Sequence, residues 1–130
     1  MPITALFAGL LAPLYILLAL RVIAARRSAR VSLGDGGDKD LARRMRVHAN
    51  FAENAPFTLV LMGLAESLHA SSTGLYAAGA CLLAGRLLHA YGVSQSDETF
   101  AIRTVAIILT LSAIAIAATT CLRLTIWGRP

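Results

Sequence analysis

Four long apolar segments constrain the fold of this 130-residue chain more than any other feature. They cover residues 3–23, 51–68, 75–91 and 102–124. A helix rises about 1.5 Å per residue, so about 20 apolar residues cross the ~30 Å hydrocarbon core of a bilayer. The chain is therefore predicted to be an all-α integral membrane protein, one domain built as a four-helix bundle. The expected helices cover residues 3–26, 41–68, 73–91 and 100–124.

The composition agrees with a membrane protein. Hydrophobic residues make up 57% of the chain and charged residues 15%, whereas a soluble domain has about 25% charged residues. The net charge of +5 does not predict a nucleic-acid partner, because positive charge in membrane proteins collects in cytoplasmic loops. Cys81 and Cys121 both lie inside apolar segments, which favours buried small side chains over a disulfide.

The basic residues predict the orientation of the chain in the membrane. Eight of the twelve Lys and Arg residues lie between Arg21 and Arg46, and Arg86 and Arg103 flank the third connection. The second connection has none. The excess of positive charge places the first and third loops in the cytoplasm and both termini outside.

A polar face enters the second apolar segment from its charged end. At about 100° per residue, Arg46, Asn50 and Glu53 project from one side of a helix, and Asn54 and Pro56 follow. Charged groups are expensive where a chain enters hydrocarbon, and they tend to mark a functional site there. A purely structural helix would not need this face.

Further polar residues are expected at the same side of the membrane. Arg86 and His89 lie one turn apart in the third segment, and Arg103 opens the fourth. Several guanidinium groups around the Glu53 carboxylate leave surplus positive charge, and arginine suits carboxylate or phosphate groups. Asn50 offers a donor and an acceptor. A small zwitterion with more than one carboxylate fits this set, and no metal site is expected because the histidines lack ligand spacing.

Structural readings of the same residues stay open. Arg26 and the two arginines that follow it could act only as topology signals that contact lipid headgroups. Glu53 could pair with Arg46 or Arg86 simply to join two helices. The long side chain of Arg86 could also reach the membrane interface from within its helix.

Three stretches of the sequence resemble one known family. Residues 46–56 match its most specific signature, Arg-x3-Asn-x2-Glu followed by a proline, and residues 22–32 and 85–92 are similar to its first and third helices. The family is MAPEG, the membrane-associated proteins in eicosanoid and glutathione metabolism, which includes microsomal glutathione transferases and leukotriene C4 synthase. The resemblance covers nearly the whole chain and is greatest to bacterial members.

The resemblance implies a homotrimer in the bacterial inner membrane, with glutathione bound between subunits near the cytoplasmic side. Other implied partners are membrane lipids and a lipophilic substrate. His89 stands where related members have a glutathione-contacting tyrosine, and Arg103 lies in the region of their thiol-activating arginine. The residues that the resemblance assigns to glutathione are Arg26, Arg46, Asn50, Glu53, Arg86 and His89.

The residues and the resemblance are consistent with two functions. In the first, the chain is a glutathione-dependent membrane enzyme that conjugates or reduces lipophilic electrophiles or hydroperoxides, with Arg103 stabilising the glutathione thiolate. In the second, it is a non-catalytic protein of the same fold that binds lipid headgroups or another anionic small molecule. Asn54 and Val93 motivate the second function, because they replace ligand-contacting tyrosines of related members.

Overall fold

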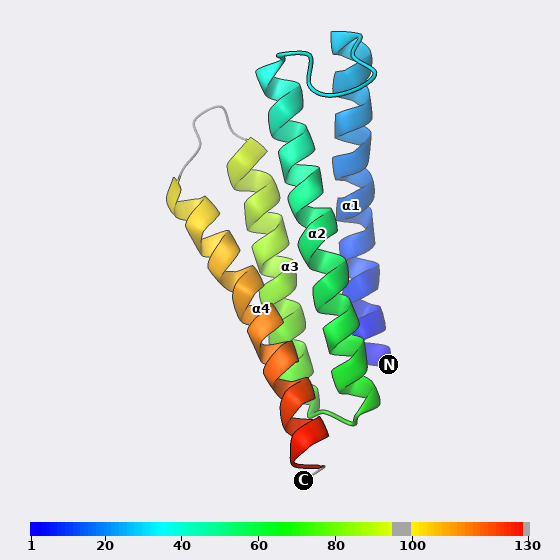
Figure 1. Ribbon diagram of the computed structural model, residues 1–130, viewed down its shortest axis with the longest axis vertical. Helices are drawn as coiled ribbons and strands as arrows, with labels where there is room; N and C mark the ends of the chain where they lie inside the picture. Colours follow the sequence, from blue (N-terminus) through cyan, green and yellow to red (C-terminus); the bar gives the residue numbers. More distant parts are fainter. Residues whose placement is uncertain (95–99, 129–130) are drawn as a thin grey trace.

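A computed structural model describes residues 1–94 and 100–128, and side chains are described for all of these except 93 and 94. Its long helices confirm the predicted all-α, four-helix fold (Figure 1). The helices are α1 (Pro2–Ala29), α2 (Lys39–Ser67), α3 (Ser72–Ser94) and α4 (Phe100–Ile126).

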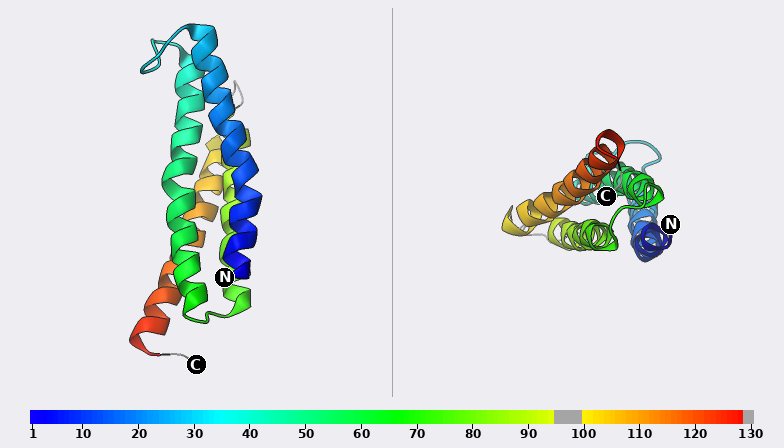
Figure 2. Two further views of the ribbon diagram at one scale, coloured as in Figure 1. Left: turned by 90° about the vertical axis from the view of Figure 1, so that its right-hand side faces the viewer. Right: turned by 90° about the horizontal axis from the view of Figure 1, so that it is seen from below.

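The four helices run up and down along one long axis. Consecutive helices pack side by side, and α2 also contacts α4 while α1 contacts α3. Within the described residues α1 and α4 make no contact, and the end-on view in Figure 2 shows them apart. The connection between α1 and α2 therefore lies at the same end of the bundle as the end of α3 and the start of α4.

Two apolar clusters hold the bundle together. One includes Leu18, Phe51 and Leu82, and the other includes Phe7 and Met62. Small residues let helices approach closely in such bundles. At Gly79 of α3, for example, an added Cβ would lie 2.1 Å from the Phe7 ring. The ring of α1 thus packs directly against the backbone of α3.

The outer faces of the bundle are apolar. Both α1 and α4 are long and apolar enough to cross a membrane, each with a mean hydropathy of 2.3. Large side chains on them, such as Leu17 and Leu111, are more than half exposed. A soluble protein rarely exposes contiguous apolar surface of this kind, whereas lipid solvates it well. The other two helices fall short of the same criterion, since α2 begins with charged turns and α3 contains Arg86 and His89.

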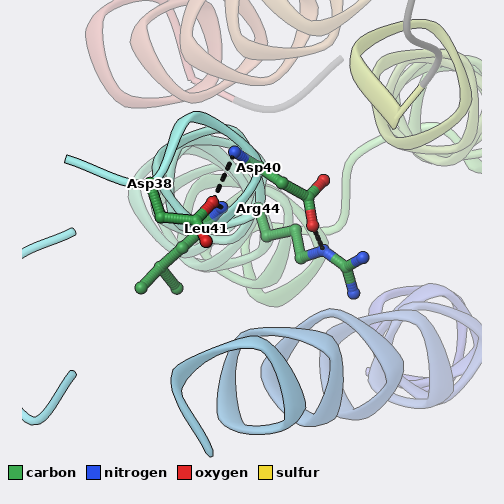
Figure 3. Close-up of polar contacts among 4 residues, drawn as sticks. All are labelled: Asp38, Asp40, Leu41 and Arg44. Carbon is green, nitrogen blue, oxygen red and sulfur yellow. Dashed lines mark hydrogen bonds and ion pairs between the residues drawn. The ribbon is translucent and has the colours of Figure 1, made fainter. Parts of the chain in front are cut away.

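A side-chain cap starts α2. The carboxylate of Asp38 accepts hydrogen bonds from the backbone N–H groups of Asp40 (2.9 Å) and Leu41 (3.0 Å), as Figure 3 shows. The first N–H groups of a helix have no partner within the helix, so this carboxylate satisfies two of them. One turn on, Arg44 Nε pairs with the Asp40 carboxylate at 2.8 Å.

A second carboxylate caps α1 from the opposite end of the molecule. Glu66, near the end of α2, accepts hydrogen bonds from the N–H groups of Ile3 (2.9 Å) and Thr4 (2.8 Å). The negative charge also complements the positive end of the helix dipole. This contact joins the start of α1 to the end of α2.

Candidate functional site

The centre of the candidate site is the buried side chain of Arg86 in α3, which is 2% exposed. Its Nη1 atom donates hydrogen bonds to Asn50 Oδ1 (2.5 Å) and to the Asn50 carbonyl (3.2 Å). Its Nη2 atom donates to the Thr110 hydroxyl. One guanidinium group therefore ties α3 to both α2 and α4.

A close approach of α3 and α4 makes the contact with Thr110 possible. At Gly85, an added Cβ would lie 2.7 Å from Thr110 Oγ1 and 3.0 Å from the Ala106 carbonyl. The Thr110 hydroxyl itself donates to that carbonyl at 2.9 Å. Its oxygen is then left to accept from Arg86. Only glycine leaves room for this crossing.

The charge on Arg86 is not neutralised within the part of the chain that the structure describes. Neither Asn50 nor Thr110 carries a charge, and no ion pair joins Arg86 to a described carboxylate. Its Nε atom is buried without a hydrogen-bond partner among the described residues. Burying a cation without a counter-charge is costly. Because Arg86 is buried and bonded to Asn50 and Thr110, the two alternatives left open above, in which its side chain reaches the membrane interface or pairs with Glu53, are not observed.

Two further basic residues lie near Arg86. His89, one turn along α3, is 5% exposed, and the guanidinium groups of both Arg86 and Arg103 are close enough to act on it electrostatically. The two helices also approach at Gly92, where an added Cβ would lie 3.8 Å from the Arg103 backbone nitrogen. The structure thus brings Arg86, His89 and Arg103 together with Asn50, and we call these four residues the basic cluster.

The remaining residues of the α2 signature face outward. Arg46 and Glu53 are exposed, while Asn50 between them is half-buried. Neither charged side chain bonds to another described residue, so the alternative pair between Arg46 and Glu53 is also not observed. Asn54 instead donates to the Asn50 carbonyl at 2.8 Å. The face offers Glu53 and Arg46 to a ligand or to another subunit.

Arg26 lies away from the basic cluster in this chain. Its Nη1 atom donates to the carbonyls of Gly34 (2.8 Å) and Ser32 (3.4 Å), and its Nη2 atom contacts Met45 Sδ at 3.3 Å. These contacts hold the connection between α1 and α2. Arg27 is exposed at the end of α1. The contact of Arg26 with a ligand therefore stays a prediction.

Sequence reasoning missed one member of the site, Thr110. Thr110 lies seven residues after Arg103, so both residues are on one face of α4. A hydroxyl group on that face of an apolar helix was the signal by which the sequence could have indicated Thr110 as a site residue. Val93, one of the replaced tyrosine positions, lies outside the residues whose side chains are described. Among the described residues, no group of three or more His, Cys, Asp or Glu side chains could hold a metal ion.

The fold and the site together define a four-helix membrane protein with a basic cluster at one end of the bundle. The sequence profile of the MAPEG family matches residues 4–123, so the chain belongs to this family. It is similar to the inner membrane protein YecN of Escherichia coli K12, with 39% identity over 90 residues and 69% of each chain covered. The YecN protein of E. coli O6:H1 matches with the same values. No solved structure matches.

Proposed function

We propose that this protein is a glutathione-dependent enzyme of the bacterial inner membrane. It would conjugate lipophilic electrophiles with glutathione or use glutathione to reduce lipophilic hydroperoxides. Membership in the MAPEG family supports a membrane protein associated with glutathione or eicosanoid metabolism, and the relatives named inner membrane proteins support the location. The reaction and the thiol are our proposal.

The observation that carries the proposal is the positive charge of the buried Arg86, which no carboxylate among the described residues neutralises. Arg86 is buried beside Asn50 without a carboxylate partner among the described residues, and Arg103 lies at the same end. A ligand with carboxylates would supply the missing negative charge. Glutathione has two carboxylates, one ammonium group and several amides. The exposed Glu53 carboxylate offers a partner for the ammonium group.

Arg103 is our candidate for activating the thiol. A free thiol has a pKa near ~8.5, and an adjacent guanidinium group lowers it, which raises the thiolate fraction at neutral pH. The thiolate sulfur then attacks the electrophile, so the protein needs no nucleophile of its own. In this scheme Arg46, Asn50, Glu53 and His89 hold glutathione, with Arg26 approaching from the last turn of α1.

We propose that a homotrimer completes the site. Arg46 and Glu53 are exposed charged groups on α2, and the exposed apolar residue Phe57 follows Glu53 one turn later. A charged group at such a border favours a protein neighbour over lipid. A lipophilic substrate would reach the site laterally from the bilayer between two subunits. Glutathione would enter from the cytoplasm, on the side of the first and third loops.

Glutathione titration by calorimetry, followed by transferase and peroxidase assays, tests the proposal. We expect saturable binding by the purified protein and a large loss of turnover in Arg103→Ala. The matched control is Arg123→Ala, which makes the same substitution near the other end of α4 and should keep full activity. Unchanged turnover in Arg103→Ala would remove this residue from the mechanism.

The alternative is a non-catalytic protein that binds lipid headgroups or another anionic small molecule at the basic cluster. The same positive charge favours it, because phosphate also matches arginine. Mass spectrometry of lipid that copurifies with the protein, before and after addition of glutathione, separates the two. Lipid that glutathione does not displace, together with no saturable binding of glutathione, would favour the alternative.

A further inference from the structure

We propose that Arg86 orients the Asn50 carboxamide so that its NH2 group is presented to the ligand, and that Thr110 is a positioning residue for this arrangement. The ligand group held at Asn50 is then an acceptor, a carboxylate or an amide carbonyl, and not an ammonium group. This inference rests on the proposed function, because it concerns the thiol ligand of that site.

The orientation of the Asn50 carboxamide follows from its partner. A guanidinium group has five N–H donors and no acceptor, and Arg86 Nη1 lies 2.5 Å from one end of the carboxamide. That end must be the oxygen, so Nδ2 occupies the other position. Nδ2 forms no hydrogen bond with another described residue, and Asn50 is only half-buried. The group available to a ligand is therefore the N–H donor.

Thr110 holds the guanidinium group in the orientation that this requires. Its hydroxyl proton is used at the Ala106 carbonyl, 2.9 Å away, so its oxygen can accept from Arg86 Nη2. The guanidinium group is planar, and fixing Nη2 also fixes the direction of Nη1. Thr110 is 2% exposed and reaches Asn50 only through Arg86. It acts on the ligand indirectly.

The charge at the site favours the same ligand groups. A buried guanidinium group next to Asn50 attracts a carboxylate or a carbonyl oxygen and repels an ammonium group. An ammonium group could use the remaining lone pair of Asn50 Oδ1 only by lying beside the Arg86 guanidinium group that this oxygen already binds. Glu53, one turn further along α2 and exposed, is then the place for the ligand ammonium group.

Asn50→Asp is the decisive variant, measured on the full-length protein in mild detergent by calorimetric titration with glutathione. Aspartate keeps the acceptor that Arg86 uses and adds a charge pair, so we expect unchanged or raised thermal stability. It removes the donor, so we expect the dissociation constant to rise at least about 10-fold, as for loss of a hydrogen bond to a charged group. Equal or tighter binding would overturn the inference, since it would mean that Asn50 accepts from the ligand.

Thr110→Val and Thr110→Ser form a matched pair that tests the positioning role without changing Asn50. Valine removes the hydroxyl at similar volume, and we expect glutathione binding to weaken about 2- to 10-fold. Serine keeps the hydroxyl and should restore binding, which a purely volume-dependent effect would not do. Equal binding by both variants would refute the role of Thr110. This pair also decides the question if Asn50→Asp does not fold.

The same titrations separate this inference from the proposed function. If the wild-type protein shows no saturable binding of glutathione, the proposed function fails and the inference falls with it. If the wild-type protein binds glutathione and Asn50→Asp binds it equally well, only the inference fails.

Discussion

Gly85→Ala gives the most direct test of how the candidate site is assembled. Gly85 precedes the buried Arg86 at a point where α3 and α4 cross closely. The new Cβ would lie 2.7 Å from Thr110 Oγ1, 3.0 Å from the Ala106 carbonyl and 3.1 Å from the Thr110 nitrogen. Two of these three atoms belong to the α4 backbone, which cannot rotate away as a flexible side chain can. The helices must therefore separate.

The size of the effect follows from these distances. Ordinary contact begins at 3.4 Å, so the shortest contact is too close by about 0.7 Å. Forcing an extra carbon into a packed site costs about 1–3 kcal/mol. Alanine is a better helix former than glycine by about 1 kcal/mol. The expected net loss in the free energy of unfolding is therefore about 0–2 kcal/mol, and Gly85→Ala should be less stable by about 1–3 kcal/mol than a protein with the same substitution at an open helix position. Separation at this point also lengthens the bond between Arg86 and Thr110.

Denaturant unfolding in mild detergent, followed by helical circular dichroism, measures this loss. Gly9→Ala is the matched control, because an added Cβ on Gly9 of α1 would meet nothing within 4 Å. It should leave stability unchanged or slightly raise it. We also expect Gly85→Ala to bind glutathione more weakly than Gly9→Ala does. A Gly85→Ala protein as stable as the Gly9→Ala protein would refute the close crossing of α3 and α4.

Three further predictions concern the helix ends and the thiol. Asp38→Ala should lower the free energy of unfolding by about 0.5–2 kcal/mol, measured by denaturant unfolding, because two N–H groups at the start of α2 lose their acceptor. Glu66→Gln should lower the unfolding temperature in a thermal-shift assay, since one of the two acceptor oxygens of Glu66 is replaced by an NH2 group. An unchanged unfolding temperature would show that this cap does not stabilise the protein. Arg103→Ala should raise the pKa of bound glutathione thiol, and an unaltered pH dependence of thiolate absorbance would contradict this.

The four helices were predictable because an apolar segment in a bilayer has few alternatives to a helix. Their ends were less so. The first helix was predicted over residues 3–26 and extends to Ala29, where Arg30 adopts a left-handed conformation with φ of 55°. Arg26 and Arg27 in the last turn complement the negative end of the helix dipole, so this helix continues past its apolar stretch. Hydropathy alone does not show that charged residues extend a helix beyond its apolar stretch.

The site was predictable in part, and the division has a physical reason. Helical spacing alone put Arg46, Asn50 and Glu53 on one face, because residues along one helix have a fixed angular relation. The bond between Arg86 and Thr110 joins residues 24 positions apart, and it depends on how closely α3 and α4 cross at Gly85. The periodic pattern of residues within one helix does not specify the distance between two helices. Arg26 likewise bonds to loop carbonyls, whose positions depend on the path of the connection.

Arg86 also supports the proposal that the basic cluster binds an anionic ligand and does more than join helices. If its role were only to join three helices, apolar side chains of similar volume would do so without the cost of burying a charge. A carboxylate on a neighbouring helix would at least offset that cost, and the described residues provide none. The bundle instead keeps a cation that Asn50 and Thr110 orient but do not neutralise. An arrangement that is unfavourable for the protein alone becomes favourable once an anion binds beside it.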